Sequence, residues 1–405
     1  MRGFRTRRSV EEVVGWIDAR VGPLGVEGTD LLEAAGRVLA EEVRAGGAVP
    51  PFDRAAMDGY AVRGEETFGS DPYNPALFRL VGRSRPGQPF AGTVGPGEAV
   101  LIATGAPLPE GADAVVRVEA TQADGETIQV VEPTPPGRHV GRRGEDIATG
   151  TAVLPAGRVL RPQDLGVLSA LGLRTVPVLR RPVVAILITG DELLPPGTPA
   201  HAHRIADMNS PMLAALVARD GGRPRIIGPL ADDREGLRAA IRDAAASADA
   251  LLISGGSSTG PEDHAPTLVA ELGELAAHGV ALRPASPTGL GFLGRLPVVL
   301  LPGNPVSCLC AYDFFAGRVV RRLAGRPPDW PYRAAVLPLA QKLASALGRV
   351  DYARVRIVEG RVEPLAISGA SILSSTTRAD GFVVIPADLE GYPPGERVTV
   401  WLYDQ

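Results

Sequence analysis

The spacing of hydrophobic residues changes along this 405-residue chain, and each spacing predicts a different kind of element. Over Ser9–Val21 apolar positions recur at helical intervals behind a serine that can cap the helix. A similar pattern predicts a second, shorter helix over Thr29–Leu39, and another lies near Pro162–Leu171. Between residues 48 and 138 short β-prone runs are broken by glycine and proline, which is typical of a compact β-rich module.

From Pro182 to Arg326 short apolar runs alternate with helical stretches, which favours an α/β layer with a parallel sheet buried on both faces. The predicted strands are Val183–Ile188, Arg225–Ile227, Ala250–Ile253 and Val298–Leu301. The predicted helices are Ser210–Arg219, Arg234–Ser247, Ala265–Ala277 and Val306–Leu323. After a proline- and glycine-rich linker, the last 75 or so residues read as β-prone segments and turns. These predict a small β-barrel or sandwich.

These changes of pattern predict four domains. An elongated discontinuous domain takes residues 1–47 and 139–180, and a β-rich domain of residues 48–138 is inserted in it. The α/β domain covers 181–327, and the C-terminal β-barrel domain covers 328–405. Each of these is long enough to bury a core, in line with the length of the chain.

The composition excludes some classes of function. Hydrophobic residues make up 45% and charged residues 22%, as in soluble globular proteins. A formal net charge of −4 gives no general affinity for nucleic acid or anionic membranes, so an anionic ligand would need local cations, helix N-termini or a metal ion. Cys308 and Cys310 are predicted to be core residues, which favours a reducing cytoplasm. Neither a signal peptide nor a membrane-spanning run is predicted.

Three predicted strands of the α/β region run into loops that share one design. The loops are Thr189–Glu192, Ser254–Gly260 and Pro302–Pro305, and all three contain glycine. Ligands of open parallel sheets bind beyond the carboxyl ends of the strands, where such loops gather. Small residues also let backbone N–H groups approach an anion closely. Each loop alone could be an ordinary strand-to-helix turn, but the three together favour a binding site.

Carboxylates accompany these loops, and carboxylates beside an anion-binding loop favour a divalent metal such as Mg²⁺. The candidates are Glu192, Asp207, Asp232 and Asp263, all predicted near strand ends. Each of them could instead have a purely structural role. For example, Asp232 and its neighbour Asp233 precede a predicted helix and could simply cap it.

A further acidic candidate is Asp58, in the run Pro50–Val62 that reads PPFDRAAMDGYAV. The aspartate is followed by glycine and a β-prone run, so it is expected at a turn that enters a strand. An ordinary Asp-Gly turn is the alternative. The pattern G-x-G-x-x-G over Gly289–Gly294 lacks the strand-then-helix context of dinucleotide binding and is interpreted as a turn. His201 and His203 are interpreted as solvated.

In combination and order, these motifs resemble one family, the molybdopterin molybdenumtransferases, known as MoeA in bacteria and as the E domain of gephyrin in animals. The resemblance covers nearly the whole chain from about Ser9. It rests on the motifs PPFDRAAMDGYAV, ATGAPLPEGADAVV, GEDI, ITGDEL, DMNS, the Asp232-Asp233 pair, ISGGSSTGPED, LPGNPVS and GRVDYARV.

The resemblance implies an Mg²⁺-dependent enzyme that inserts molybdate into adenylylated molybdopterin and releases AMP. It also implies the four domains given above, and a cytoplasmic homodimer whose cleft lies between the α/β domain of one subunit and the inserted domain of the other. Apo-molybdoenzymes or the adenylyltransferase that makes the substrate are the protein partners it implies, with no role for nucleic acid or membrane.

Position by position, the resemblance assigns roles to residues of this chain. It implies catalytic roles for Asp58, Thr104, Asp146, Glu192, Asp232 and Asp263, of which Glu192, Asp232 and Asp263 would also bind metal. Substrate binding is assigned to Ser254, Gly255, Gly256, Ser257, Gly260, Arg283, Pro302, Gly303, Asn304, Pro305, Arg354 and Ser375.

Two positions depart from the family pattern. Ser286 stands where a second lysine is common, and Asp380 stands where asparagine is common. Loss of one cation beside an anion could weaken its binding by about 1–3 kcal/mol. These departures motivate an alternative hypothesis, a gephyrin-like scaffold that binds a protein partner without full catalysis. A nucleotide oxidoreductase is the third reading and rests only on the glycine pattern at Gly289.

Overall fold

The computed structural model describes residues 7–256, 263–366 and 369–403. The chain forms two compact units. Unit 1 consists of Met1–Gly28, Gly36–Ala40 and Pro177–Gln405, and unit 2 of Thr29–Ala35 and Glu41–Val176. The predicted division into four domains stays a prediction. In the described part of the chain no helix has the length and apolar composition needed to cross a bilayer.

Unit 1 contains an α/β sheet with the strand order β16-β13-β17-β21-β20-β18. In that order the strands are Arg223–Leu230, Val183–Thr189, Ala250–Ser254, Leu296–Leu301, Gly289–Leu293 and Glu274–His278. The first four run parallel, as predicted, but β20 and β18 pair antiparallel with their neighbours. The predicted parallel sheet is therefore confirmed for these four strands, while the sheet as a whole is mixed because of this antiparallel edge.

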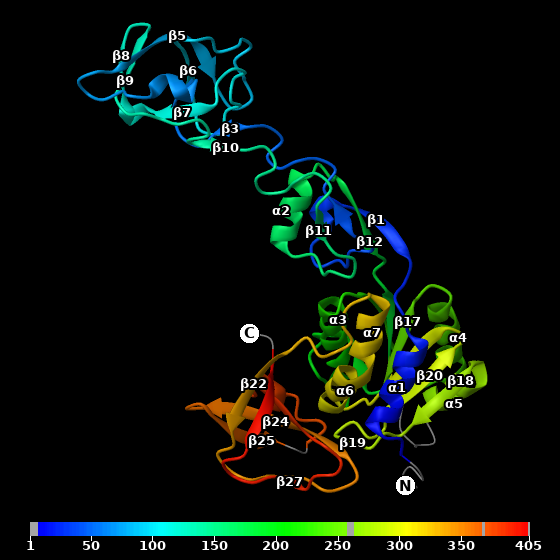
Figure 1. The fold of residues 1–405 in the computed structure, drawn as a ribbon. Helices are drawn as coiled ribbons and strands as arrows, with labels where there is room; N and C mark the ends of the chain where they lie inside the picture. Colours follow the sequence, from blue (N-terminus) through cyan, green and yellow to red (C-terminus); the bar gives the residue numbers. More distant parts are fainter. Residues whose placement is uncertain (1–6, 257–262, 367–368, 404–405) are drawn as a thin grey trace. The chain divides into compact units, whose positions relative to one another are not determined.

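Both faces of this sheet are buried, and β13 shows it residue by residue. Val184, Ile186 and Ile188 join one core, with α1 (Val10–Arg20), α3 (Asn209–Arg219) and the long helix after β21. Ala185 and Leu187 join the opposite core, with α4 (Arg234–Ala245) and α5 (Ala265–Leu272) (Figure 1). A strand buried on both faces has no polar positions, which explains its continuous apolar run.

Two predictions in this region were wrong. Helix α5 ends at Leu272 instead of Ala277, because Gly273 closes it and the next residues form β18. The segment read as a turn is β20, with only Gly294 at a turn conformation (φ 63°). Gly291 lies inside that strand, where a Cβ would come 2.4 Å from Val269 Cγ1. Glycine is therefore needed there so that α5 can pack closely on the strand.

The C-terminal part of unit 1 holds a second sheet, here called the C-terminal sheet, with the order β19-β24-β26-β28-β22 and β25 added to β24. These strands are Leu282–Arg283, Val350–Val358, Gly381–Ile385, Arg397–Leu402, Arg333–Pro338 and Arg361–Ala366. A short pair, β23 (Leu343–Ala344) with β27 (Gly391–Tyr392), and the short helix α8 (Ser374–Thr377) complete it. The predicted β-rich ending is confirmed, and its closure into a barrel stays a prediction.

Unit 2 is built around a sheet with the order β7-β4-β6-β5-β9-β8. Its strands are Ala114–Arg117, Gly59–Val62, Glu98–Ile102, Ala76–Ser84, Thr127–Val130 and Thr121–Asp124. Shorter strands are β2 (Val43–Arg44), β3 (Arg54–Ala55), β10 (Val140–Gly141) and β11 (Ala152–Leu154). This sheet confirms the predicted β-rich character of the region.

The two helices predicted around the β-rich module fared differently. Helix α2 spans Pro162–Ala170, as predicted. The helix predicted over Thr29–Leu39 was wrong, because strand β1 (Val26–Asp30) leads into a single 3-10 turn, Leu31–Glu33. Asp30 caps that turn, and Gly36 adopts a left-handed conformation (φ 71°) that stops a helix from continuing.

Candidate functional site

A cavity of about 530 Å³ lies at the carboxyl ends of β13, β17 and β21 in unit 1. The three glycine-containing loops predicted to gather there do so. Predicted residues that line the cavity are Glu192, Asp207, Asp232, Ser254, Gly255, Gly256, Asp263, Pro302, Gly303, Asn304 and Pro305. Ser257 and Gly260, also predicted, lie outside the described residues.

Gly255 permits the sharp turn at the end of β17. Its φ is 100°, and a Cβ at this position would lie 2.1 Å from the carbonyl oxygen of Thr189. Gly303 is less restricted, since a Cβ there would meet its nearest neighbour at 3.8 Å. Only the first of these two glycines is therefore required by the backbone around it.

Asn209 joins two of the loops. Its Nδ2 donates to Ser254 Oγ at 2.9 Å and to the carbonyl oxygen of Gly303 at 2.8 Å. The side chain is buried, so both hydrogen bonds are shielded from water. The DMNS motif contains this residue, but no role was predicted for it, because nothing local in the sequence shows that its amide reaches across two strands.

Asp207 fits both interpretations, because it caps a helix and also lines the cavity. Its Oδ1 accepts from the backbone N–H groups of Asn209 at 2.8 Å and Ser210 at 3.0 Å, and so caps the start of α3. Its Oδ2 is buried and has no hydrogen-bond partner in the described structure. The residue lines the cavity, although this oxygen itself is buried.

The Asp232-Asp233 pair divides its roles. Asp232 faces the cavity, where its Oδ1 accepts from Thr189 Oγ1 at 2.5 Å and its Oδ2 accepts from the Asp191 N–H at 3.3 Å. Asp233 caps α4 by accepting from the Gly236 N–H at 2.6 Å. The capping interpretation therefore holds for Asp233 and not for its neighbour.

Glu192 and Asp263 are the other predicted metal ligands on the cavity wall. Among the described residues, no three His, Cys, Asp or Glu side chains are close enough together to hold a metal ion. Protein side chains alone do not build a complete metal site there. Mg²⁺ commonly takes only one or two protein carboxylates and completes its shell with water and substrate phosphates. The carboxylates present fit that mode of binding.

The loop Pro302–Pro305 receives a contribution from the C-terminal part of the chain. Ser371 Oγ donates to Asn304 Oδ1 at 2.8 Å, and the Val306 N–H donates to the carbonyl oxygen of Ala370 at 2.9 Å. Ser371 lines the cavity. Sequence reasoning missed this serine, since it lies far along the chain from every strand-end loop.

Three predicted binding residues do not line this cavity. Arg283 forms an ion pair with Asp351, Arg354 is fully buried on β24, and Ser375 is buried and donates to the Ile372 carbonyl at 2.6 Å. The two departures from the family pattern also have partners within unit 1. Ser286 Oγ donates to the Val280 carbonyl at 3.3 Å, and Asp380 Oδ2 accepts from the Ile357 N–H at 2.6 Å.

Unit 2 holds the remaining candidates. Asp58 immediately precedes β4, as predicted, and lines a separate cavity of about 310 Å³ with Arg83 and Arg85. Its Oδ1 accepts from the Thr104 backbone N–H at 2.6 Å and from Thr104 Oγ1 at 2.9 Å, and these bonds lower the pKa of the Asp58 carboxyl. Asp146 is exposed in a loop and does not line that cavity.

Three family models match successive parts of this chain. The MoeA N-terminal region (domain I and II) matches residues 8–172. The model described as "Probable molybdopterin binding domain" matches residues 185–322, and the MoeA C-terminal region (domain IV) matches residues 336–403. The cavity at the ends of β13, β17 and β21 thus falls mainly in the second match.

Similar proteins match this chain over nearly its full length. Molybdopterin molybdenumtransferase 2 of Mycobacterium tuberculosis is 37% identical over 92% of this chain and 93% of its own length. Molybdopterin molybdenumtransferase of Bacillus subtilis is 32% identical over 90% of this chain and 87% of its own length. The crystal structure of a molybdopterin biosynthesis MoeA protein from Pyrococcus horikosii matches with a TM-score of 0.85 at 33% identity, covering 99% of this chain and 100% of that one. This chain belongs to the MoeA family, which confirms the resemblance seen in its motifs.

Proposed function

We propose that this chain transfers molybdate into adenylylated molybdopterin and releases AMP, giving molybdenum cofactor. One observation carries the proposal: the cavity that joins Glu192, Asp232 and Asp263 to the glycine-containing loops lies in a chain whose relatives, matched over nearly full length, are named molybdopterin molybdenumtransferase. Such a cavity suits a substrate that carries phosphate, because backbone N–H groups bind anions and carboxylates hold a cation or water.

The residues of the cavity take separate tasks in this proposal. Gly255, Gly256 and Gly303 keep the strand-end loops open to the close approach of a phosphate. Asp232 is held by Thr189, so its carboxylate keeps one orientation toward the cavity. Glu192 and Asp263 flank the same space and orient water or a cation beside the phosphoanhydride. Ser254, with its hydroxyl held by Asn209, is positioned for an oxyanion.

The proposal includes Mg²⁺, held by one or two of these carboxylates together with substrate phosphate oxygens. When bound, it would neutralise charge that develops on the departing phosphate. It also includes a cytoplasmic homodimer, in which Asp58 and Thr104 of one subunit would face the α/β cavity of the other. Asp58 has the chemistry for such a role, since Thr104 holds its carboxylate through two hydrogen bonds that also lower its pKa.

The experiment that tests this function is molybdate-dependent AMP release from adenylylated molybdopterin, with and without Mg²⁺, read together with activation of an apo-molybdoenzyme. AMP release that requires molybdate, followed by activation, would support the insertase. Tight binding of the substrate without AMP release would overturn it and point to the scaffold. The control is a Glu192→Gln variant, which keeps the size of the side chain and removes its charge; we expect it to lose AMP release and keep the fold.

A further inference from the structure

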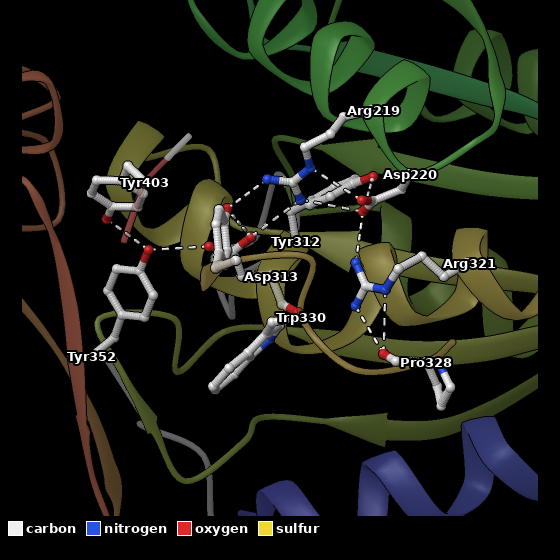
Figure 2. Close-up of polar contacts among 10 residues, drawn as sticks. Arg219, Asp220, Tyr312, Asp313, Arg321, Pro328, Trp330, Tyr352 and Tyr403 are labelled. Carbon is white, nitrogen blue, oxygen red and sulfur yellow. Dashed lines mark hydrogen bonds and ion pairs between the residues drawn. The ribbon is translucent and has the colours of Figure 1, made fainter. Parts of the chain in front are cut away.

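A buried polar cluster lies at the junction between the α/β sheet and the C-terminal sheet of unit 1 (Figure 2), and none of its residues lines the cavity. The Asp313 cluster, as it is called here, consists of Arg219, Asp220, Tyr312, Asp313, Arg321, Tyr332, Tyr352 and Tyr403. Figure 2 shows Tyr352 and Tyr403 on one side of Asp313, and Arg219 and Asp220 on the other. The proposed reaction uses none of these groups.

Asp313 is the member that joins the two sheets. Its Oδ1 accepts from Tyr332 OH at 2.8 Å, and its Oδ2 accepts from Tyr352 OH at 3.1 Å. Tyr352 lies on β24 and shares a hydrogen bond of 2.7 Å with Tyr403. Arg219 lies at the end of α3, and its Nη2 is 3.7 Å from Asp313 Oδ1. Two tyrosines linked to the C-terminal sheet and one arginine of the α/β layer therefore converge on one carboxylate.

The centre of the cluster is enclosed. Asp313 has no exposed surface, Asp220 is 1% exposed and Arg321 is 3% exposed. Asp220 Oδ2 accepts from Arg321 Nη1 at 2.7 Å and from Tyr312 OH at 3.0 Å. Burying charges is costly even when they are paired, and well-packed apolar residues in such places are often as stable or more stable. A cluster of this kind adds geometric specificity more readily than it adds stability.

One continuous helix connects Asp313 to the wall of the cavity. The helix after β21 begins with α6 (Pro305–Ala311), continues through a π-helical turn (Tyr312–Ala316) and ends with α7 (Gly317–Leu323). Pro305 lines the cavity at the N-terminus of this helix, and Asp313 lies in the π-helical turn. Turns of this type often mark functional sites, because the extra residue redirects side chains that a regular helix would point elsewhere.

The C-terminal part of the chain returns to the same helix at its first turn. The Ala370 carbonyl accepts from the Val306 N–H, and Ser371 donates to Asn304 at the cavity. Helix α6 and the turn after it thus meet the C-terminal part of the chain twice, at the cavity through 370–371 and at the cluster through Tyr352. Val306 and Asp313, which make these two contacts, lie on one continuous helix.

We propose that Asp313 is a positioning residue for the reaction: by holding Tyr332 and Tyr352 it aligns the C-terminal sheet with helix α6, and so keeps Ser371 on Asn304 at the wall of the cavity. This inference rests on the proposed function for its effect on activity. Its structural part, the alignment of 370–371 with α6, can be measured without any reaction.

The titration of Asp313 supports this role. Burial raises the pKa of its carboxyl to about 6, against an ordinary 3.8. The titratable and charged groups that interact with it are Arg219 and Asp220 at the end of α3, Cys310 in α6, Tyr332 before β22, Tyr352 on β24 and Tyr403 after β28.

The sign of the pH effect follows from that raised pKa. The folded state binds the proton more tightly than the unfolded state, so the stabilisation from this group is full below pH 3.8 and lost as pH rises through 6. Ionised Asp313 therefore costs stability at neutral pH, while it accepts from both tyrosines and pairs with Arg219. Protonation relaxes that cost and loosens the alignment.

The first test uses Asp313→Asn, which mimics the protonated carboxyl. We expect its melting temperature to equal or exceed that of the wild-type chain at pH 7, while the Val306 amide exchanges hydrogen at least about tenfold faster. Amides of β13 serve as the internal control and should not change. Unchanged protection at Val306 would overturn the proposal. If Asp313→Asn fails to fold, Tyr352→Phe, which keeps the ring and removes one hydrogen bond, takes its place.

The second test asks whether Asp313 acts through Ser371. Asp313→Asn should lower kcat/KM for AMP release several-fold, Ser371→Ala should do the same, and the double variant should be no worse than either alone. The wild-type chain should lose AMP-release activity as the pH falls through about 6, and this loss should be absent in Asp313→Asn. Additive losses would contradict the proposal. A wild-type chain without AMP release would count against the proposed function alone, because the exchange experiment would still decide on the alignment.

Discussion

Unit 1 contains two groups of carboxylates that lie in opposite surroundings. Glu192, Asp232 and Asp263 line a cavity that is open to ligand, and Asp232 accepts hydrogen bonds from a hydroxyl and a backbone N–H. Asp220 and Asp313 are buried and are surrounded by arginine and tyrosine. The first group faces a cavity that a ligand can enter, and the second makes its hydrogen bonds and ion pairs inside the protein.

The contrast separates the carboxylates proposed to take part in the reaction from those that hold neighbouring parts of the fold in place. A carboxylate at the end of a parallel strand can exchange water for a cation or a phosphate-bound metal at little cost, because it stays partly solvated. An enclosed carboxylate cannot exchange its partners without a large penalty, so it holds its neighbours in one arrangement. Removing a member of the first group should change activity at constant stability. Removing a partner of the second should change stability.

The sharpest way to break this comparison is the neighbouring pair Asp232 and Asp233. We expect Asp232→Ala to lower AMP release by about 10²–10⁴-fold, the range typical for loss of a positioned catalytic group. Asp233→Ala removes only the cap of α4 and should cost about 1 kcal/mol of stability with activity retained. Steady-state rates and thermal unfolding of both variants check this, and equal activity in the two would contradict the division of roles.

The enclosed group is tested by Arg321→Met. This change leaves Asp220 with one arginine and a tyrosine in a buried site, so we expect a loss of about 3 kcal/mol in the free energy of unfolding. Denaturant unfolding measures it. The control is Arg79→Met, which breaks an exposed ion pair with Glu98 and should cost less than about 1 kcal/mol. Similar losses in the two variants would mean that the enclosed pair has no special role.

The shape of the cavity is tested by two glycines that line it. Gly255→Ala places a Cβ against the Thr189 carbonyl in a left-handed conformation, so we expect a loss of about 1–3 kcal/mol and a raised KM for substrate. Gly303→Ala has room for its Cβ and should fold normally. Thermal unfolding and KM values compare them; a tolerated Gly255→Ala would show that the loop can relax.

The smallest expected effect concerns Asp58 in unit 2. Thr104→Val removes the hydroxyl donor and leaves the backbone donor, so the pKa of Asp58 should rise toward its ordinary value. Titration of the carboxyl groups followed by NMR measures this rise. Thr121→Val, on the same sheet, is the control. An unchanged pKa of Asp58 would show that the Thr104 hydroxyl does not lower it.

The sequence predicted the open group of carboxylates well and the enclosed group hardly at all. Strand-end loops with glycine leave a local signature, because the geometry of a parallel sheet brings the carboxyl ends of its strands together. Asp313 lies in an apolar run and Asp220 follows a helix, so neither departs from a common pattern. Their partners come from residues 219, 332 and 352, and only the tertiary fold brings these together.

The fold was predicted best where hydrophobic spacing was unambiguous. The strands buried on both faces and the helices α1, α3 and α4 were predicted close to their bounds. The segment 273–294 was not, because a short apolar run with glycines suits a helix end, a turn or an edge strand equally well. Asn209 and Ser371 were missed for a related reason: a single amide or hydroxyl carries no spacing that points to its partner.

Asn209 also has a consequence for how this pocket tolerates change over evolution. One amide group spans Ser254 on one loop and the Gly303 carbonyl on another, so it acts as a shared constraint on two segments separated by many residues. A change in the length of either loop must preserve its distance to this amide or lose the hydrogen bond. Insertions in this half of the protein are therefore expected to accumulate outside these two loops.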